Sequence, residues 1–302
     1  MELSSIKNLV LSGGGVKGYA YVGVIKALEE YNIITNLKSI AGTSIGAVFA
    51  FLIILKYSFK ELKELSTNLS LDKINNISTD NIFDFFNSKG IDDGHNSERI
   101  IKILLKAKTN KYDITFKELY EYNEITLNIN SYRLNDHKDI IFNHLDNPNF
   151  SVIKAIRMSI SIPFFYTPIK YQNFTYVDGG VKNNFLINLY ENKIHETLGF
   201  LIEENNSEVN VDDIQDFFKN IFYTLTSKID KKITDKFNII SIKTDVNILE
   251  INIDTESRNI LINSGYENTK KFFENFDKNK KISISKNTQT EINYFDKSTQ
   301  TD

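Results

Sequence analysis

The chain has 302 residues, of which 41% are hydrophobic and 25% charged, and its formal net charge is −3. This is the composition of an ordinary globular protein with enough residues for one large core, and it gives no global reason to expect nucleic-acid binding. The chain contains no cysteine, which excludes disulfides and thiolate metal sites. We therefore expect one main domain whose fold is held by packing alone.

The beginning of the chain predicts neither a secretory signal nor a membrane span. Polar and acidic residues precede an apolar strand over 9–11, which runs directly into a run of glycines. The most apolar stretch, residues 45–55, is too short for a bilayer-spanning helix, which needs about 20 apolar residues. We expect a soluble, cytoplasmic protein that meets membranes only peripherally.

The predicted elements alternate between strands and helices in the first part of the chain. Residues 9–11 predict a strand, and residues 19–30 predict a helix after the glycine run. Residues 38–41 predict a second short strand that ends at a Gly-Thr-Ser turn, and residues 45–55, apolar all round, predict a buried helix. This alternation favours an α/β fold with a mainly parallel sheet flanked by helices.

The middle of the chain continues with helices over 59–69 and 97–108. A third helix begins at the capping box formed by Thr115 and Glu118. Residues 125–134 and 140–143 then predict strands.

The last part of the predicted domain contains further strands and helices. A helix over 151–160 is stopped by Pro163, an extended segment over 167–177 leads into Asp178, and strands follow at 198–202 and 239–243. Residues 212–233 carry apolar side chains at helical spacing, a face that fits the core better than a membrane surface. A final helix over 257–276 closes the domain.

The sequence Gly42-Thr43-Ser44-Ile45-Gly46 fits the Gly-x-Ser-x-Gly turn of a nucleophile elbow. In such a turn the serine lies on a sharp strand-to-helix bend, where glycines avoid collisions with the neighbouring backbone. The helix N-terminus favours negative charge, which suits an acyl-enzyme reaction that passes through an oxyanion. Ser44 is therefore the candidate nucleophile.

The glycine run begins as Gly13-x-Gly15-x-x-Gly18, which literally matches the dinucleotide fingerprint. That interpretation requires an acidic residue at the end of the second strand, where the chain has 38–42 (KSIAG). A phosphate-binding P-loop is excluded because Tyr19 follows Gly18. The interpretation that remains is an oxyanion hole, a loop of amide donors beside the nucleophile. Tight binding of NADH would instead favour the dinucleotide alternative.

Taken together, these motifs resemble those of the patatin-like phospholipase family over residues 6–184. The run 13–18 resembles the family's oxyanion loop, 42–46 its nucleophile elbow, and Asp178-Gly179-Gly180 its catalytic Asp-Gly motif. Segments 163–168 and 183–184 are also similar. One departure is Phe185-Leu186, where the family commonly has a proline after the Asn-Asn pair.

The resemblance implies a patatin-like α/β hydrolase with no metal or organic cofactor. Ser44 would attack a lipid acyl ester and Asp178 would accept the serine proton. Because an ordinary aspartate has a pKa of about 3.9, burial or hydrogen bonding must adjust that of Asp178. The remaining site residues implied by the resemblance are, in the oxyanion loop, Gly13, Gly14, Gly15, Lys17 and Gly18, and, in the elbow and Asp-Gly motifs, Gly42, Gly46, Gly179 and Gly180.

A Ser-Asp-His triad is the competing interpretation of the active site. His195 follows Ser44 and Asp178 in the chain order of α/β-hydrolases, although the Gly-Gly turn after Asp178 does not fit that fold. The other three histidines are expected in solvated loops, and 92–95 (DDGH) lacks the ligand spacing of a known metal site. Segment 164–166 (FFY) is a candidate for lipid contact or for core packing.

The polar residues 277–302 predict a disordered tail after a hydrolase domain at 1–276. Segments 286–291 and 297–302 repeat a Lys-x-Thr-Gln-Thr pattern that resembles peptides bound as an added strand by dynein light chain. The residues concerned are Thr288, Gln289, Thr290, Thr299, Gln300 and Thr301. The alternative function is therefore a lipid-binding adaptor, although short repeats also arise in biased tails. The tail and an Asn-, Ile- and Lys-rich composition fit a virus or intracellular parasite in host cytoplasm.

Overall fold

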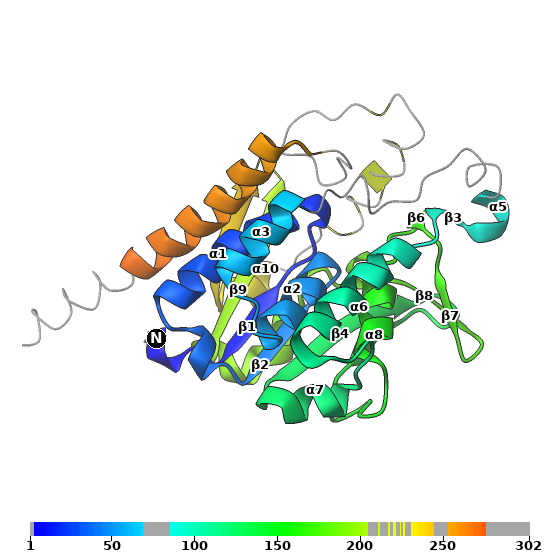
Figure 1. Cartoon of the computed structure of the whole chain (residues 1–302), viewed down its shortest axis with the longest axis horizontal. Helices are drawn as coiled ribbons and strands as arrows, with labels where there is room; N and C mark the ends of the chain where they lie inside the picture. The colour runs from blue at the N-terminus through cyan, green and yellow to red at the C-terminus, as the bar shows by residue number, and fades with distance from the viewer. Residues whose placement is uncertain are drawn as a thin grey trace, which may run out of the picture.

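The computed structural model shows an α/β fold with a central sheet flanked by helices (Figure 1). The described residues are 3–68, 85–204, 211, 217, 220–221, 224, 226, 231–244 and 253–275. The helix predicted over 212–233 lies mostly outside them, and the predicted tail at 277–302 lies wholly outside them.

The centre of the sheet is parallel. Its neighbours pair in parallel in the order β10-β9-β1-β2-β4. These strands are β1 (Asn8–Leu11), β2 (Ser39–Gly42), β4 (Thr126–Arg133), β9 (Thr197–Glu204) and β10 (Asn238–Thr244). Antiparallel pairing adds β5 (Lys138–Phe142), β7 (Ile169–Tyr171) and β8 (Phe174–Asp178). The predicted mainly parallel sheet is therefore confirmed, with antiparallel strands around β4.

Strand β4 brings two strands from distant parts of the chain end to end. Ile129 pairs with Gly42 and also with a residue of β5, so β2 and β5 occupy opposite edges of β4. Ser131 pairs with a residue of β5 and also with Asp178, so β8 shares the edge of β2. Strands β2 and β8 run in opposite directions, and their last residues lie two positions apart along β4.

Helices cover the sheet because its strands present apolar residues to both faces. Leu9 and Leu11 belong to the larger core, whereas Val10 between them belongs to a smaller core on the other face. The larger core is built with α1 (Ala20–Glu30), α2 (Ile45–Ile54), α3 (Phe59–Asn68), α6 (His95–Thr109), α7 (Phe116–Asn123) and α8 (Val152–Ser159). The smaller core uses the 3-10 segment η6 (Leu186–Glu196).

The short elements contain most of the differences from prediction. The extended segment predicted over 167–177 is a hairpin of β7 and β8, whose turn residues Gln172 and Asn173 both have positive φ. Strands β3 (Gly90–Asp92) and β6 (Phe164–Tyr166) form a separate parallel pair that the sequence did not predict. The other short elements are η1 (Leu3–Ser5), η2 (Gly15–Tyr19), η3 (Ile34–Asn36), α5 (Phe85–Ser88), η5 (Gly179–Val181) and α10 (Lys231–Thr234). The capping box of α7 is present as predicted.

The last described helix spans 255–275 and packs closely on α1, drawn as the orange and blue helices in Figure 1. A side chain on Gly23 would overlap the Ile262 carbonyl oxygen, and one on Gly265 would overlap that of Ala20. The two helices can approach this closely because both contact positions are glycine.

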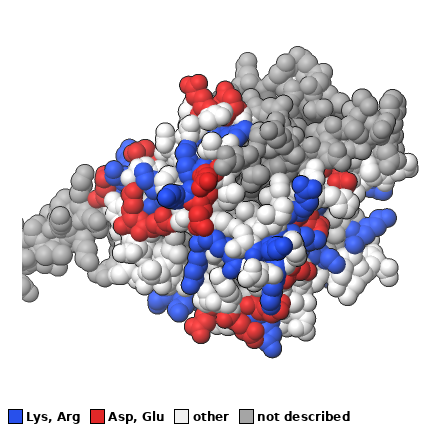
Figure 2. Space-filling view, viewed as in Figure 1, with Lys and Arg blue, Asp and Glu red and all other residues white. Residues whose placement is uncertain are grey.

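The described surface carries both signs of charge. Figure 2 shows Lys and Arg side chains interspersed with Asp and Glu on the face seen in Figure 1. Within the described ranges, no helix has both the length and the apolar character needed to span a membrane.

Candidate active site

The predicted nucleophile elbow forms between β2 and α2. Ser44 follows β2 by two residues and has φ 53° and ψ −125°, a backbone conformation that is strained for a residue with a side chain. A side chain on Gly42 would overlap the Gly46 carbonyl oxygen, and one on Gly46 would overlap that of Leu11. Both glycines are therefore needed for the sharp bend that presents Ser44 at the start of α2.

Asp178 reaches Ser44 because β8 ends on the edge of β4 that β2 also occupies. The Asp178 backbone amide donates to the Ser161 carbonyl oxygen at 2.8 Å. Its Oδ1 accepts a hydrogen bond of 2.7 Å from the Gly180 amide. Gly179 and Gly180 begin the 3-10 turn η5, so the chain turns directly after Asp178 at the end of β8.

The carboxylate of Asp178 is completely buried, and this burial raises its pKa to about 7. The nearby Ser44 hydroxyl and the Gly180 amide oppose this rise because they favour the charged form. Oδ2 has no hydrogen bond of regular geometry to any described residue. The pKa of Asp178 is thus shifted in the direction that a base acting at neutral pH requires.

The glycine loop supplies two backbone donors. The Gly13 amide already donates to the Asn184 carbonyl oxygen at 3.1 Å, and the Lys17 amide to that of Gly14 at 3.1 Å. By contrast, the amides of Gly14 and Gly15 make no hydrogen bond within the described part of the chain. Among the loop residues predicted for the oxyanion hole, these two carry the available donors.

The other three predicted residues of the glycine loop are closely packed against their neighbours. The Lys17 side chain is fully buried. Gly18 allows close packing, because a side chain there would overlap that of Ile45. Gly13 is equally confined by the side chain of Asn184.

A small cavity of about 20 Å³ joins the separate parts of the site. This volume suffices for one water molecule, and hence for a small reacting group. The lining residues come from distant parts of the chain and are Gly14, Gly15, Ser44, Ile162, Asp178, Asn184 and Thr226. The candidate nucleophile, the candidate base and the two glycines therefore line one space.

Four supporting hydrogen bonds were not predicted from sequence. The Ser44 amide donates to Ser159 Oγ at 2.9 Å, which fixes the elbow against the end of α8. Asn130 Nδ2 donates to the carbonyl oxygens of Gly179, at 3.3 Å, and Asn183, at 2.9 Å. Thr43 Oγ1 donates to the same Asn183 oxygen at 3.2 Å. No motif signals Ser159 or Asn130, because their roles depend on contacts far apart in the chain.

The departure from the family pattern after the Asn-Asn pair has a local explanation. The Phe185 amide donates to Asn183 Oδ1 at 3.2 Å and closes a turn. A proline at position 185 has no N–H and could not make this bond. In this chain a hydrogen bond from Phe185 holds the loop, whereas the family's proline would restrict the backbone through its ring.

The structure separates His195 from Ser44. His195 lies near the beginning of β1, where its carbonyl oxygen accepts from Ser5 and that of Glu196 accepts from Lys7. Ser44 lies beyond the opposite end of the parallel strands. The triad with His195 is therefore not formed.

The other three histidines are also placed outside the site. His95 is exposed and pairs with Asp93 at 2.9 Å. His144 stacks on Tyr120, and His137 lies in the turn between β4 and β5. The carboxylates of 92–95 hold the start of α6, with Asp92 Oδ1 accepting from Gly94 at 2.6 Å.

The aromatic segment 164–166 has mixed surroundings. Phe164 is partly exposed, and its φ of 70° is strained. Phe165 and Tyr166 pack with Ile162, which also lines the small cavity. The core interpretation therefore holds for Phe165 and Tyr166, whereas Phe164 is accessible and its contact with lipid stays a prediction.

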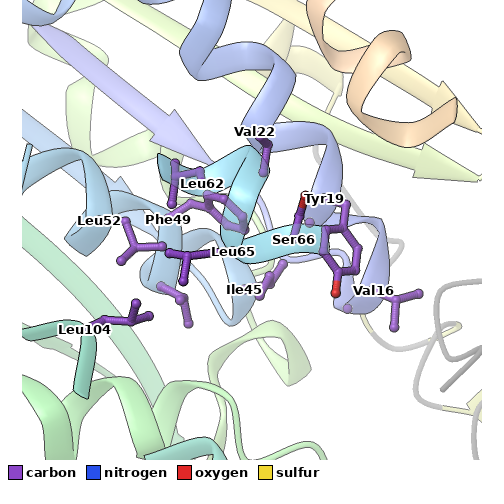
Figure 3. A pocket seen from close by; sticks show the side chains of 13 residues that line it. Val16, Tyr19, Val22, Ile45, Phe49, Leu52, Leu62, Leu65, Ser66 and Leu104 are labelled. Atoms are coloured by element: carbon purple, nitrogen blue, oxygen red, sulfur yellow. The ribbon is translucent and has the colours of Figure 1, made fainter. Parts of the chain in front are cut away.

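A larger apolar cavity adjoins the small one. Its volume is about 150 Å³, and Gly15 lines both cavities. Figure 3 shows side chains from η2, α1, α2, α3 and α6 around it, with Val16 and Tyr19 toward one end and Leu52 and Leu104 toward the other. An uncharged, hydrocarbon-lined space thus lies beside Ser44.

The doubly covered sheet, the strained Ser44 elbow and the buried Asp178 define an α/β protein with a hydrolase-like site. A family model described as Patatin-like phospholipase matches residues 9–189. The chain belongs to the patatin-like phospholipase family.

Two viral relatives are similar to much of this chain, and a solved structure shares its fold. Uncharacterized protein R571 of Acanthamoeba polyphaga mimivirus is 28% identical over 88% of this chain and 93% of its own length. Probable lipid hydrolase 463L of Invertebrate iridescent virus 6 is 32% identical over 62% of this chain and 65% of its own length. VipD from Legionella pneumophila shares the fold, with a TM-score of 0.63, 16% identity and coverage of 90% of this chain and 67% of VipD.

The family and its relatives support a lipid hydrolase function for this chain. Relatives in two viruses agree with the expectation of a viral or parasitic source. The proposed dynein light chain peptides, at 286–291 and 297–302, lie outside the described residues. Binding by the tail stays a prediction.

Proposed function

We propose that the protein is a phospholipase A-type acyl hydrolase that uses Ser44 and Asp178 as a catalytic dyad. The observation that carries the proposal is the small cavity, which Ser44, Asp178, Gly14 and Gly15 line together. No histidine lies in this lining. A buried aspartate with a pKa of about 7 has the proton affinity that a general base needs at neutral pH.

In the first half of the reaction, Ser44 Oγ attacks the ester carbonyl carbon while its proton passes to the Asp178 carboxylate. The amides of Gly14 and Gly15 stabilise the oxyanion, at about 3 kcal/mol for each donor. The bond to the leaving alcohol then breaks, and Asp178 returns the proton to the alcohol oxygen. Fatty acid remains attached to Ser44 as an ester.

In the second half, water attacks the acyl-serine. Asp178 takes one proton of the water as the new carbon–oxygen bond forms, and it returns a proton to Ser44 Oγ as the acyl–serine bond breaks. Free fatty acid leaves and the site is restored. The adjoining apolar cavity supports a lipid as the acyl donor, presented at a membrane or lipid surface in host cytoplasm.

Fatty-acid release from mixed phospholipid vesicles tests the function. Purified protein should release fatty acid, and Ser44→Ala and Asp178→Asn should each lower the rate by at least about 10³-fold with folding intact. His195→Asn is the matched control and should retain the parent rate. A parent protein with no activity on any acyl ester would contradict the proposal.

A further inference from the structure

We propose that the apolar cavity beside Ser44 binds the carboxyl-proximal part of the acyl chain and selects substrates by chain length. This inference rests on the proposed hydrolase function and assigns the cavity a specificity role. Gly15 lies in the walls of both cavities, and Ile45, which directly follows Ser44, lies in the wall of the apolar one. An acyl group on Ser44 can therefore enter the apolar cavity past Gly15 and Ile45.

The lining suits a hydrocarbon chain. Apart from Tyr19 and Ser66, the lining side chains have no polar atoms, and the Ser66 hydroxyl already donates to the Lys63 carbonyl oxygen at 2.7 Å. The hydrocarbon residues are Val16, Val22, Ile45, Val48, Phe49, Leu52, Leu62, Leu65 and Leu104. A cavity of this kind and size admits small apolar guests in preference to water.

The far end of the cavity sets the length that fits. Leu52 of α2 and Leu104 of α6 are both nearly buried and lie at the end away from Val16 (Figure 3). An apolar cavity of about 150 Å³ holds a guest the size of benzene, so this one takes about six carbon atoms of an acyl chain. The structure thus favours a break in selectivity near six carbons, with the rest of a longer chain outside the cavity.

Hydrolysis of 4-nitrophenyl esters from acetate to laurate tests this proposal. We expect kcat/KM to rise about fourfold with each methylene, the equivalent of about 0.8 kcal/mol, up to about six carbons and then to level off. Leu104→Ala should move the break to longer chains, and Leu104→Phe and Leu52→Phe should move it to shorter ones. Ile103→Ala, at an exposed neighbouring position of α6, is the control and should leave the profile unchanged.

A binding measurement separates this proposal from the hydrolase function. Ser44→Ala protein with labelled leucine methyls is titrated with 2-octanone, a neutral and unhydrolysable probe. Methyls of Leu52, Leu62 and Leu104 should shift, whereas those of the exposed Leu145 should not. Shifts without hydrolysis of any ester would support the cavity's role in binding hydrocarbon and contradict the proposed function.

Two results would overturn the chain-length proposal itself. One is ester hydrolysis whose length profile is unchanged in all the Leu104 and Leu52 variants. The other is the absence of shifts at the lining leucines while the same probe competes with ester hydrolysis by the parent protein.

Discussion

At the scale of single residues, the burial of Asp178 raises its pKa and thereby sets the pH range in which it can accept a proton. The side chain is completely excluded from solvent and its Oδ2 lacks a regular hydrogen bond within the described ranges. These conditions disfavour the charged carboxylate, yet the proposed base must be charged to accept the Ser44 proton. Activity therefore depends on the fraction of Asp178 that is ionised near neutral pH.

The pH dependence of the reaction follows from this balance. Burial raises the pKa of Asp178 to about 7, so kcat/KM should rise with pH through a midpoint near 7 and then level off. An unperturbed aspartate would place the midpoint near ~3.9. Initial rates on a soluble short-chain ester between pH 4 and 9 measure the midpoint. A rate already constant above pH 5 would contradict the assigned role.

Ser159 provides a second test at this scale. Ser159→Ala removes the oxygen that accepts from the Ser44 amide and leaves a buried N–H without its partner. We expect a loss of about 1–3 kcal/mol in the free energy of unfolding, together with a lower kcat. Urea unfolding and ester kinetics measure the two effects, with Ser58→Ala at the start of α3 as a control for kcat. An unaltered kcat and stability would show that the Ser159 contact does not support the elbow.

At the scale of helices and strands, the sequence predicted the elements with long or repeated patterns. Short apolar runs and longer helical patterns predicted the described central strands and flanking helices within a few residues, and the Thr115 capping box fixed the start of α7. The hairpin at Gln172 and Asn173 was missed because its two positive-φ residues are not the usual Asn-Gly or Gly pairs. Strands β3 and β6, with three residues each, contain too few positions for a periodic pattern.

The close contact of α1 with the helix over 255–275 gives a prediction for an element. Gly265→Val would force a side chain into the Ala20 carbonyl oxygen, and we expect the free energy of unfolding to fall by about 1–3 kcal/mol or more. Ile260→Val, at an exposed position of the same helix, should change it by less than about 0.5 kcal/mol. Thermal and urea unfolding compare the two. Equal stability of both variants would mean that this helix does not pack on α1 as described.

At the scale of the whole molecule, the site is assembled by topology. Strands β2 and β8 come from distant parts of the chain and meet on one edge of β4, which places Ser44 beside Asp178. The motifs identified both residues from sequence. They did not predict Ser159 or the apolar cavity, which depend on how α3, α6 and α8 pack, or Asn130, whose role depends on the pairing of β4 with β8.

The stability of the whole molecule should also depend on Asp178. Its pKa of about 7 in the folded state exceeds the ~3.9 of the unfolded chain, so the folded state holds the proton more tightly. The resulting stabilisation is complete below about pH 4 and is lost as the pH rises through about 7. Relative to the parent, Asp178→Asn should therefore gain stability between pH 4 and pH 8, by a few kcal/mol. Urea unfolding at both pH values measures this gain; a difference independent of pH would contradict the raised pKa.

The domain boundary at 276 and the binding role of the tail remain predictions at this scale. Peptides covering residues 286–302 can be titrated with dynein light chain in a calorimeter. Heat of binding from the parent peptide, lost on replacing Gln289 and Gln300 with alanine, is the expected result. No heat from the parent peptide would remove the adaptor alternative.

Covalent labelling with a fluorophosphonate, followed by mass spectrometry, tests the central claim most directly because it reports on the nucleophile without requiring the right lipid. We predict one adduct per chain, located on Ser44, absent in Ser44→Ala and formed far more slowly in Asp178→Asn, while His195→Asn reacts at the parent rate. An adduct on another residue, or labelling of Ser44 at an equal rate in Asp178→Asn, would contradict the Ser44–Asp178 dyad.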